Sequence, residues 1–158
     1  MHFTRTSYNR LRKRVAKATG RKLPVCPRGP NVNEQRFNRL VLAGHGNFEP
    51  TKVEITNSGK VYTPDFCYAG SNLGKGSRIV MIEVKGTYRS KKDEKLICER
   101  SRLAWEVAGD RHPEVDWVWA KYQRGGYLCE LRTDEPERIT AFCRNNQDFE
   151  NLLKGKVK

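Results

Sequence analysis

The chain lacks several features that define large classes of protein. It has no run of about 18 apolar residues, as a membrane-spanning helix needs, and residues 1–20 lack the apolar centre of a secretory signal. Its five cysteines are widely spaced without a C-x-x-C pair, and none of the three histidines is near them in sequence. We therefore expect no membrane contact, free thiols and no structural zinc. The expected location is the cytoplasm.

Positive charge is what the chain has in excess. Its 158 residues include 31 Lys and Arg against 18 Asp and Glu, a formal net charge of +13 at pH 7. Nine of the basic residues, and none of the acidic ones, fall in residues 1–30, which also include a proline-rich stretch. Such an arm favours a polyanionic partner, most commonly nucleic acid. We expect a basic arm and linker at 1–30 and a single folded domain at 31–158.

The spacing of apolar residues predicts an α/β fold. Helices are expected where apolar residues recur at helical spacing, at 8–19, 33–43, 91–108 and 137–153. Strands are expected in β-rich runs between turn residues, at 52–56, 60–68, 78–84, 115–120 and 127–131. The first three strands would form an antiparallel meander. The domain would then have a mixed central sheet in the order helix, three-strand meander, helix, strand.

The most informative pattern is Pro64-Asp65 at the end of one expected strand and Glu83-Val84-Lys85 at the end of the next. The two-residue period of a strand places Glu83 and Lys85 on one face, and antiparallel pairing would bring Asp65 beside them. Crowded buried carboxylates repel one another, and a divalent cation relieves the repulsion. Asp65 and Glu83 are therefore candidate Mg²⁺ ligands for hydrolysis of a phosphodiester, with Lys85 orienting water or stabilising charge on phosphorus.

Glu34 is a fourth candidate. It precedes Phe37 by three residues and Val41 by seven, which places it on or beside the apolar stripe of the 33–43 helix. A carboxylate without a partner is costly there, so Glu34 is predicted to be an additional metal ligand or to hold a second metal. The alternative interpretation of the whole pattern is a surface hairpin with ordinary salt bridges, since short motifs arise by chance.

Three segments in order, Tyr62-Thr63-Pro64-Asp65-Phe66, Glu83-Val84-Lys85-Gly86 and His112-Pro113-Glu114-Val115-Asp116, resemble the bacteriophage endonuclease I family of Holliday junction resolving enzymes. That family belongs to the restriction-endonuclease-like, PD-(D/E)xK superfamily, and the resemblance spans about residues 33–120. It implies a restriction-endonuclease-like core, Asp65, Glu83 and Glu34 as metal ligands with the Val84 carbonyl, and Lys85 as catalytic lysine. It also implies Mg²⁺, with Mn²⁺ able to substitute, and a homodimer whose subunits each cut one strand of branched DNA.

Two groups of basic residues are expected to contact DNA phosphates without sequence preference. The first lies on the basic arm and comprises Arg10, Arg12, Lys13, Arg14 and Lys17. The second follows the Glu-x-Lys strand and comprises Arg89, Lys91, Lys92 and Lys95, for which a solvated helix start is an equal alternative. The three tryptophans are expected to pack in the core.

The sequence thus predicts a Mg²⁺-dependent endonuclease that resolves branched DNA such as Holliday junctions. Two alternatives stay open at this point. A nuclease with the same core would cut ordinary duplex or single-stranded DNA. A non-catalytic basic DNA-binding protein would use the acidic cluster for structure alone.

Overall fold

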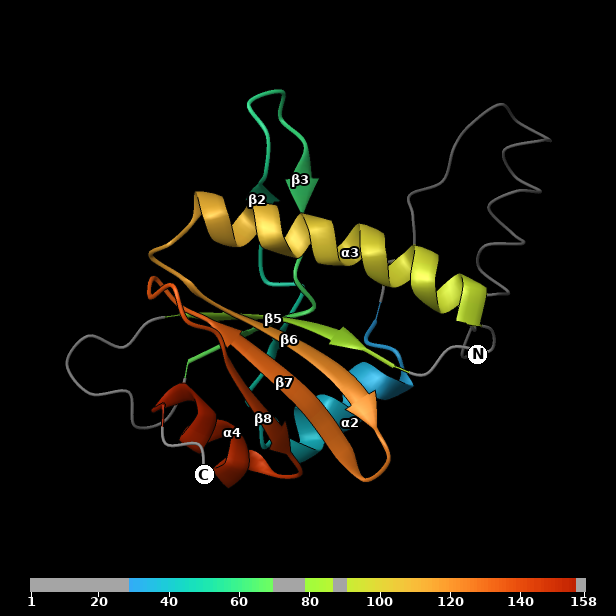
Figure 1. Ribbon diagram of the computed structural model, residues 1–158. Coiled ribbons are helices and arrows are strands. Elements are labelled where there is room, and N and C mark those ends of the chain that lie inside the picture. Colours follow the sequence, from blue (N-terminus) through green and yellow to red (C-terminus); the bar gives the residue numbers. More distant parts are fainter. Residues whose placement is uncertain (1–28, 70–78, 87–90, 156–158) are drawn as a thin grey trace, which may run out of the picture.

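The computed structural model describes residues 29–69, 79–86 and 91–155, except for the side chains of 91–97. Within these ranges the chain is a mixed α/β domain (Figure 1). Its elements in chain order are α2 (Val32–Leu40), β1 (Asn47–Phe48), β2 (Val53–Glu54), β3 (Val61–Tyr62), β4 (Phe66–Tyr68), β5 (Val80–Lys85), α3 (Lys91–Arg111), β6 (Asp116–Gln123), β7 (Gly126–Arg132), β8 (Ile139–Cys143) and α4 (Asn146–Leu153). None of the helices in this part of the chain is long and apolar enough to cross a membrane.

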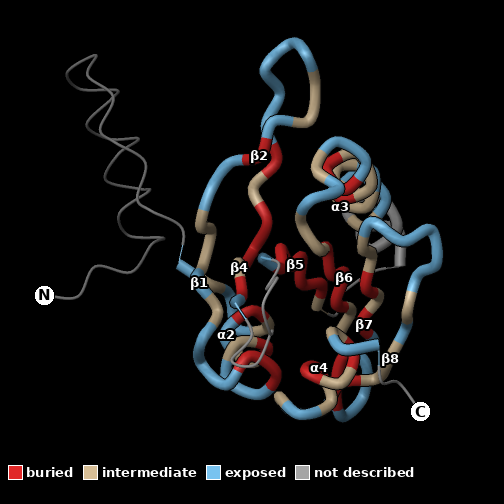
Figure 2. Tube along the Cα trace, turned by 90° about the vertical axis from the view of Figure 1, so that its left-hand side faces the viewer, coloured by how far each residue is buried: buried red, intermediate tan, exposed pale blue. Residues whose placement is uncertain are grey.

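The central sheet has six strands in the order β1-β4-β5-β6-β7-β8. β5 and β6 are parallel, and every other neighbouring pair is antiparallel, so the predicted mixed sheet is confirmed. The parallel pair is joined through α3, as a crossover connection requires. α3 covers one face of the sheet, and α2 and α4 cover the other (Figures 1 and 2).

Each face of the sheet has its own apolar layer. Trp105 of α3 packs against Met81, Trp117 and Trp119 of the sheet, so the prediction that the tryptophans pack in the core is confirmed. On the opposite face, the alternate residues of β5 and β6 pack with aromatic residues of α2 and α4, including Phe37 and Phe149. The cysteines in the described residues, Cys67, Cys98, Cys129 and Cys143, are free, as expected.

The expected three-strand meander is wrong in its first half. β2 and β3 pair with each other as a separate hairpin, which projects past α3 (Figure 1), and only the 66–68 part of the expected 60–68 strand joins the central sheet. Pro64 has no N–H to donate and constrains Thr63, so regular pairing is interrupted between β3 and β4. The antiparallel pairing of β4 with β5 is confirmed.

The expected helix at 137–153 is also wrong in its first half, because residues 139–143 form β8 at the edge of the sheet. The β-branched and aromatic residues of this segment suit a strand paired with β7. α4 begins only after Asn145, whose side chain accepts the N–H of Asp148 at 3.0 Å and caps the helix. The expected arm and helix at 8–19 lie outside the described residues, so the boundary at residue 30 stays a prediction.

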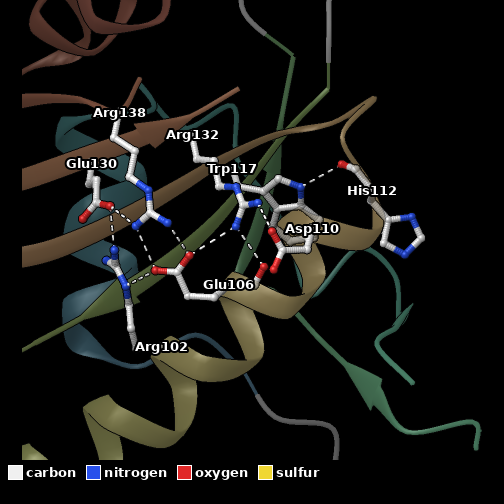
Figure 3. Close-up of polar contacts among 8 residues, drawn as sticks. All are labelled: Arg102, Glu106, Asp110, His112, Trp117, Glu130, Arg132 and Arg138. Atoms are coloured by element: carbon white, nitrogen blue, oxygen red, sulfur yellow. Dashed lines mark hydrogen bonds and ion pairs between the residues drawn. The ribbon is translucent and has the colours of Figure 1, made fainter. Parts of the chain in front are cut away.

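A network of six charged side chains fastens α3 to the sheet (Figure 3), and we call it the arginine network. It comprises Arg102, Glu106 and Asp110 of α3, Glu130 and Arg132 of β7, and Arg138 just before β8. Arg102 donates to Glu106 at 2.9 Å and to Glu130 at 2.6 Å. Arg138 donates to the same two carboxylates, at 2.6 and 2.8 Å. These bonds fix the position of α3 over β6 and β7.

Candidate active site

Asp65 lies in the bend between β3 and β4 and is only 5% exposed. Its Oδ2 accepts the backbone N–H of Val84 at 2.8 Å, and its own carbonyl accepts the N–H of Glu49 at 2.9 Å. Since Phe66 pairs with Ile82, Asp65 lies beside Glu83 at the point where the ladder between β4 and β5 ends. Because strand pairing is interrupted at Pro64, the Asp65 side chain can accept a hydrogen bond from the backbone at the end of β5.

Glu83 and Lys85 project from β5 on the face that α3 covers, and both are buried. Lys85 Nζ donates to Glu83 Oε1 in an ion pair. The hydroxyl of Tyr62 donates to the other carboxylate oxygen, Oε2, at 2.5 Å. Both oxygens of Glu83 are thus held by protein donors, one from its own strand and one from the β2–β3 hairpin.

Glu34 is 1% exposed in the first turn of α2, as its place beside the apolar stripe predicted. It forms a capping box with Asn31, whose backbone N–H donates to Oε2 at 2.8 Å and whose side-chain amide donates to Oε1. The start of α2 approaches the end of β5 closely: a Cβ on Gly86 would lie 2.0 Å from Asn33 Nδ2. A larger residue at 86 would therefore require the Asn33 side chain to move. The approach brings Glu34 to the same end of the sheet as Asp65, whose pKa the charge of Glu34 raises.

Burial and neighbouring charges shift the pKa values of this cluster. Burial raises the pKa of Asp65, and the charge of Glu83 and, more weakly, that of Glu34 add to the shift. The hydrogen bond from Val84 and the charge of Lys85 lower the pKa of Asp65, yet the net value rises to about 7. The pKa of Tyr62 is also raised well above 10, because the hydroxyl is buried and faces Glu83. Glu34, Asp65 and Glu83 are thus buried carboxylates close enough for their charges to interact.

The donor set suits a hard divalent cation. Among the described residues no three Asp, Glu, His or Cys side chains form a group that holds a metal by themselves. Mg²⁺ is commonly bound by one or two carboxylates, with waters and substrate phosphate oxygens completing its shell. Asp65 and Glu83 fit that requirement. In this structure the backbone N–H of Val84 donates a hydrogen bond to Asp65. The metal-ligating roles expected for the Val84 carbonyl and for Glu34 stay predictions.

The four residues that the sequence singled out, Glu34, Asp65, Glu83 and Lys85, therefore lie at one end of β5. Tyr62 is a member of the site that sequence reasoning missed, although it belongs to the segment that carried the resemblance. An aromatic hydroxyl two residues before the Pro-Asp pair was the available signal. Its role depends on a contact across 21 residues, which no local pattern reports.

The predicted DNA contacts cannot be placed in the same way. Six of them, Arg10, Arg12, Lys13, Arg14, Lys17 and Arg89, lie outside the described residues. Lys91, Lys92 and Lys95 belong to the first turns of α3, and their side chains lie outside the description as well. Contact of these residues with phosphates stays a prediction.

Comparisons with protein-family models, curated proteins and solved structures find no match to this chain. The resemblance to the endonuclease I family thus rests on the three sequence segments alone. The geometry at the end of β5 is the independent observation from which a function can be argued.

Proposed function

We propose that this chain is a Mg²⁺-dependent DNA endonuclease that hydrolyses phosphodiesters in branched DNA. The observation that carries the proposal is the buried pair of Asp65, directly before β4, and Glu83, on the adjacent β5, with Lys85 two residues further along β5. Clustered titratable groups with shifted pKa values are typical of functional sites. The order α2, antiparallel β4 and β5, α3, and β6 parallel to β5 supports a restriction-endonuclease-like core.

Each residue of the site has a role in this proposal. Asp65 and Glu83 hold the cation, and Tyr62 fixes the orientation of the Glu83 carboxylate. A bound Mg²⁺ supplies Lewis-acid activation of water and neutralises charge on the scissile phosphate. The Lys85 ammonium, already beside Glu83, stabilises negative charge that develops on the phosphate. The net charge of +13 favours DNA as the substrate polymer.

A cleavage assay tests the proposal. A four-way DNA junction and a linear duplex of the same length are incubated with the protein and Mg²⁺, alongside Asp65→Ala. We expect paired symmetric cuts near the branch point, no cuts with the variant, and a dimer by light scattering. Equal cutting of both DNAs would keep the catalytic site but assign it to ordinary duplex DNA.

A non-catalytic DNA-binding protein is the second candidate. It is favoured by the hydrogen bonds that Glu83 and Glu34 already make, because each bond gives its carboxylate a structural role within the fold. In that case the protein would bind both DNAs and cut neither, with or without Mg²⁺ or Mn²⁺. Such a result would overturn the endonuclease proposal.

A further inference from the structure

An open cavity of about 480 Å³ lies on the face of the sheet that α3 covers. It is lined by Cys98, Glu99, Arg102, Leu103 and Glu106 of α3 and by Trp119 and Lys121 of β6. Its volume is in the range of small-molecule sites. None of the roles proposed above for the carboxylate site uses this cavity.

The strand register places the cavity next to the candidate active site. Glu83 pairs with Trp119, and Lys85 pairs with Lys121, in the parallel ladder of β5 and β6. Paired residues project on the same face, and neighbouring strands are about 4.8 Å apart. Lys85 Nζ lies 5.6 Å from the centre of the Trp119 ring, and Arg102 Cζ lies 5.3 Å from it. Trp119 is therefore a wall shared by the site and the cavity.

The lining favours a flat, neutral group. Leu103 is 66% exposed and contributes apolar surface together with the indole of Trp119 and the thiol of Cys98. The carboxylates Glu99 and Glu106 disfavour a phosphate inside the cavity. Glu106 is already paired with arginines, so it does not require a cationic ligand. A nucleobase has the flat shape and neutral charge that this lining accepts.

Resting on the proposed function, we infer that the cavity receives the base of a nucleotide adjacent to the scissile phosphate. In a regular duplex the bases are paired and stacked, and extracting one costs a few kcal/mol. At a branch point a base unpairs at a lower cost, and in a single strand it is already unpaired. The substrate is then DNA in which the nucleotide beside the cut is unpaired or unpairs easily, and regular linear duplex is a poor substrate.

The test combines a change in the DNA with a change in the cavity. Once the cut is mapped, the nucleotide that flanks it is replaced by an abasic site, which keeps the backbone and removes the base. For the wild type we expect kcat/KM to fall about fivefold or more, the lower range for losing one base contact. Leu103→Asp and the uncharged Leu103→Ala should slow cleavage of the base-containing DNA and leave cleavage of the abasic DNA unchanged.

Leu40→Asp is the matched control, since Leu40 is a partly exposed helical leucine on the opposite side of the sheet, and it should behave as the wild type. Equal rates for abasic and base-containing DNA would overturn the inference, and so would equal slowing of both by the Leu103 variants. Binding of the same two oligonucleotides in metal-free buffer provides a readout independent of cleavage. If the wild type cuts no DNA, the proposed function fails by itself. The abasic site is then placed at the branch point, and binding that it weakens for the wild type but not for Leu103→Asp still decides whether the cavity takes a base.

Discussion

The arginine network and the candidate active site are both polar clusters close to Trp119, and they are built in opposite ways. In the network three arginines face three carboxylates, and the side chains are partly exposed. Burial raises the pKa of Glu106, but hydrogen bonds and charge from Arg138 and Arg102 outweigh it, so the net pKa is lowered. In the candidate site the carboxylates of Glu34, Asp65 and Glu83 are buried, and the pKa of Asp65 is raised.

The two clusters differ in their effect on folding. The arginine network stabilises the folded state, whereas the crowded carboxylates of the candidate site destabilise it. The ion pairs of the arginine network hold α3 against β7, and they need no ligand to neutralise their charges. Crowding buried carboxylates together costs folding free energy, and a bound cation lowers that cost. Such a cost is tolerated where the groups have a chemical task, which supports the proposal that this cluster is the functional one.

The largest expected effect is on catalysis. Asp65→Ala, Glu83→Ala and Lys85→Ala should each lower the cleavage rate by about 10³-fold, since each removes a group that stabilises charge at the reacting phosphate. Junction binding measured by gel shift should be retained. Glu130→Gln, in the arginine network, is the control and should cut at close to the wild-type rate. Full activity in any one of the three alanine variants would refute the assignment of that residue.

The second effect is on the pH dependence of stability in metal-free buffer. The pKa of Asp65 is about 7 in the folded chain, where the carboxyl faces Glu83, Glu34, Tyr62 and Lys85, and about 3.8 in the unfolded chain. The folded state binds more protons between these values, so stability falls as pH rises from about 4 to 7, by up to about 4 kcal/mol.

Urea unfolding of the wild type and Asp65→Asn at pH 5 and pH 8 measures this difference. The variant should lose most of the pH slope and be more stable than the wild type at pH 8. The wild type could instead gain stability between pH 5 and pH 8, with Asp65→Asn gaining the same amount. That result would show that the fold does not raise the pKa of Asp65.

The third effect concerns Tyr62. Tyr62→Phe removes the hydroxyl that holds Glu83 Oε2 and leaves the ring, which packs near Trp117, in place. Removing a group that orients a metal ligand typically costs about 10- to 100-fold in metal affinity or activity. The Mg²⁺ concentration for half-maximal cleavage should rise within that range while DNA binding is unchanged. An unchanged Mg²⁺ requirement would leave Tyr62 with a packing role only.

The smallest effect is expected from breaking the network. Glu106→Gln leaves Arg102 and Arg138 with weaker partners and should lower the free energy of unfolding by about 1 kcal/mol, because partly exposed pairs are screened by solvent. The loss should shrink at high salt. Urea unfolding at two salt concentrations measures it, and its sign at pH 8 is opposite to that of Asp65→Asn. A stabilising effect of Glu106→Gln would mean that the network is not balanced.

Local patterns were enough to locate the candidate site, because Glu83 and Lys85 are related by the two-residue period of one strand and Glu34 by the spacing of one helix. The same patterns did not distinguish a strand from a helix at 139–143, since β8 depends on pairing with β7. They also predicted a single strand at 60–68. In the structure this segment is divided at Pro64 into β3, which pairs with β2 in a separate hairpin, and β4, which joins the central sheet.

Contacts between distant segments were beyond the reach of spacing arguments. The hydroxyl of Tyr62 meets Glu83 only because β3 leaves the sheet, and the arginine network joins α3 to residues near 130 and 138. The cavity beside Trp119 likewise depends on the packing of α3 over β6. Each of these features follows from tertiary arrangement rather than from the order of residues in one element.

Calorimetric titration of Mg²⁺ into the metal-free protein tests most directly whether the buried carboxylate cluster is a metal centre. Wild type and Glu106→Gln should bind Mg²⁺ with the same stoichiometry, and Asp65→Asn should lose that binding. Wild type that binds no Mg²⁺ with or without junction DNA, or Asp65→Asn that binds as well as the wild type, would contradict the account.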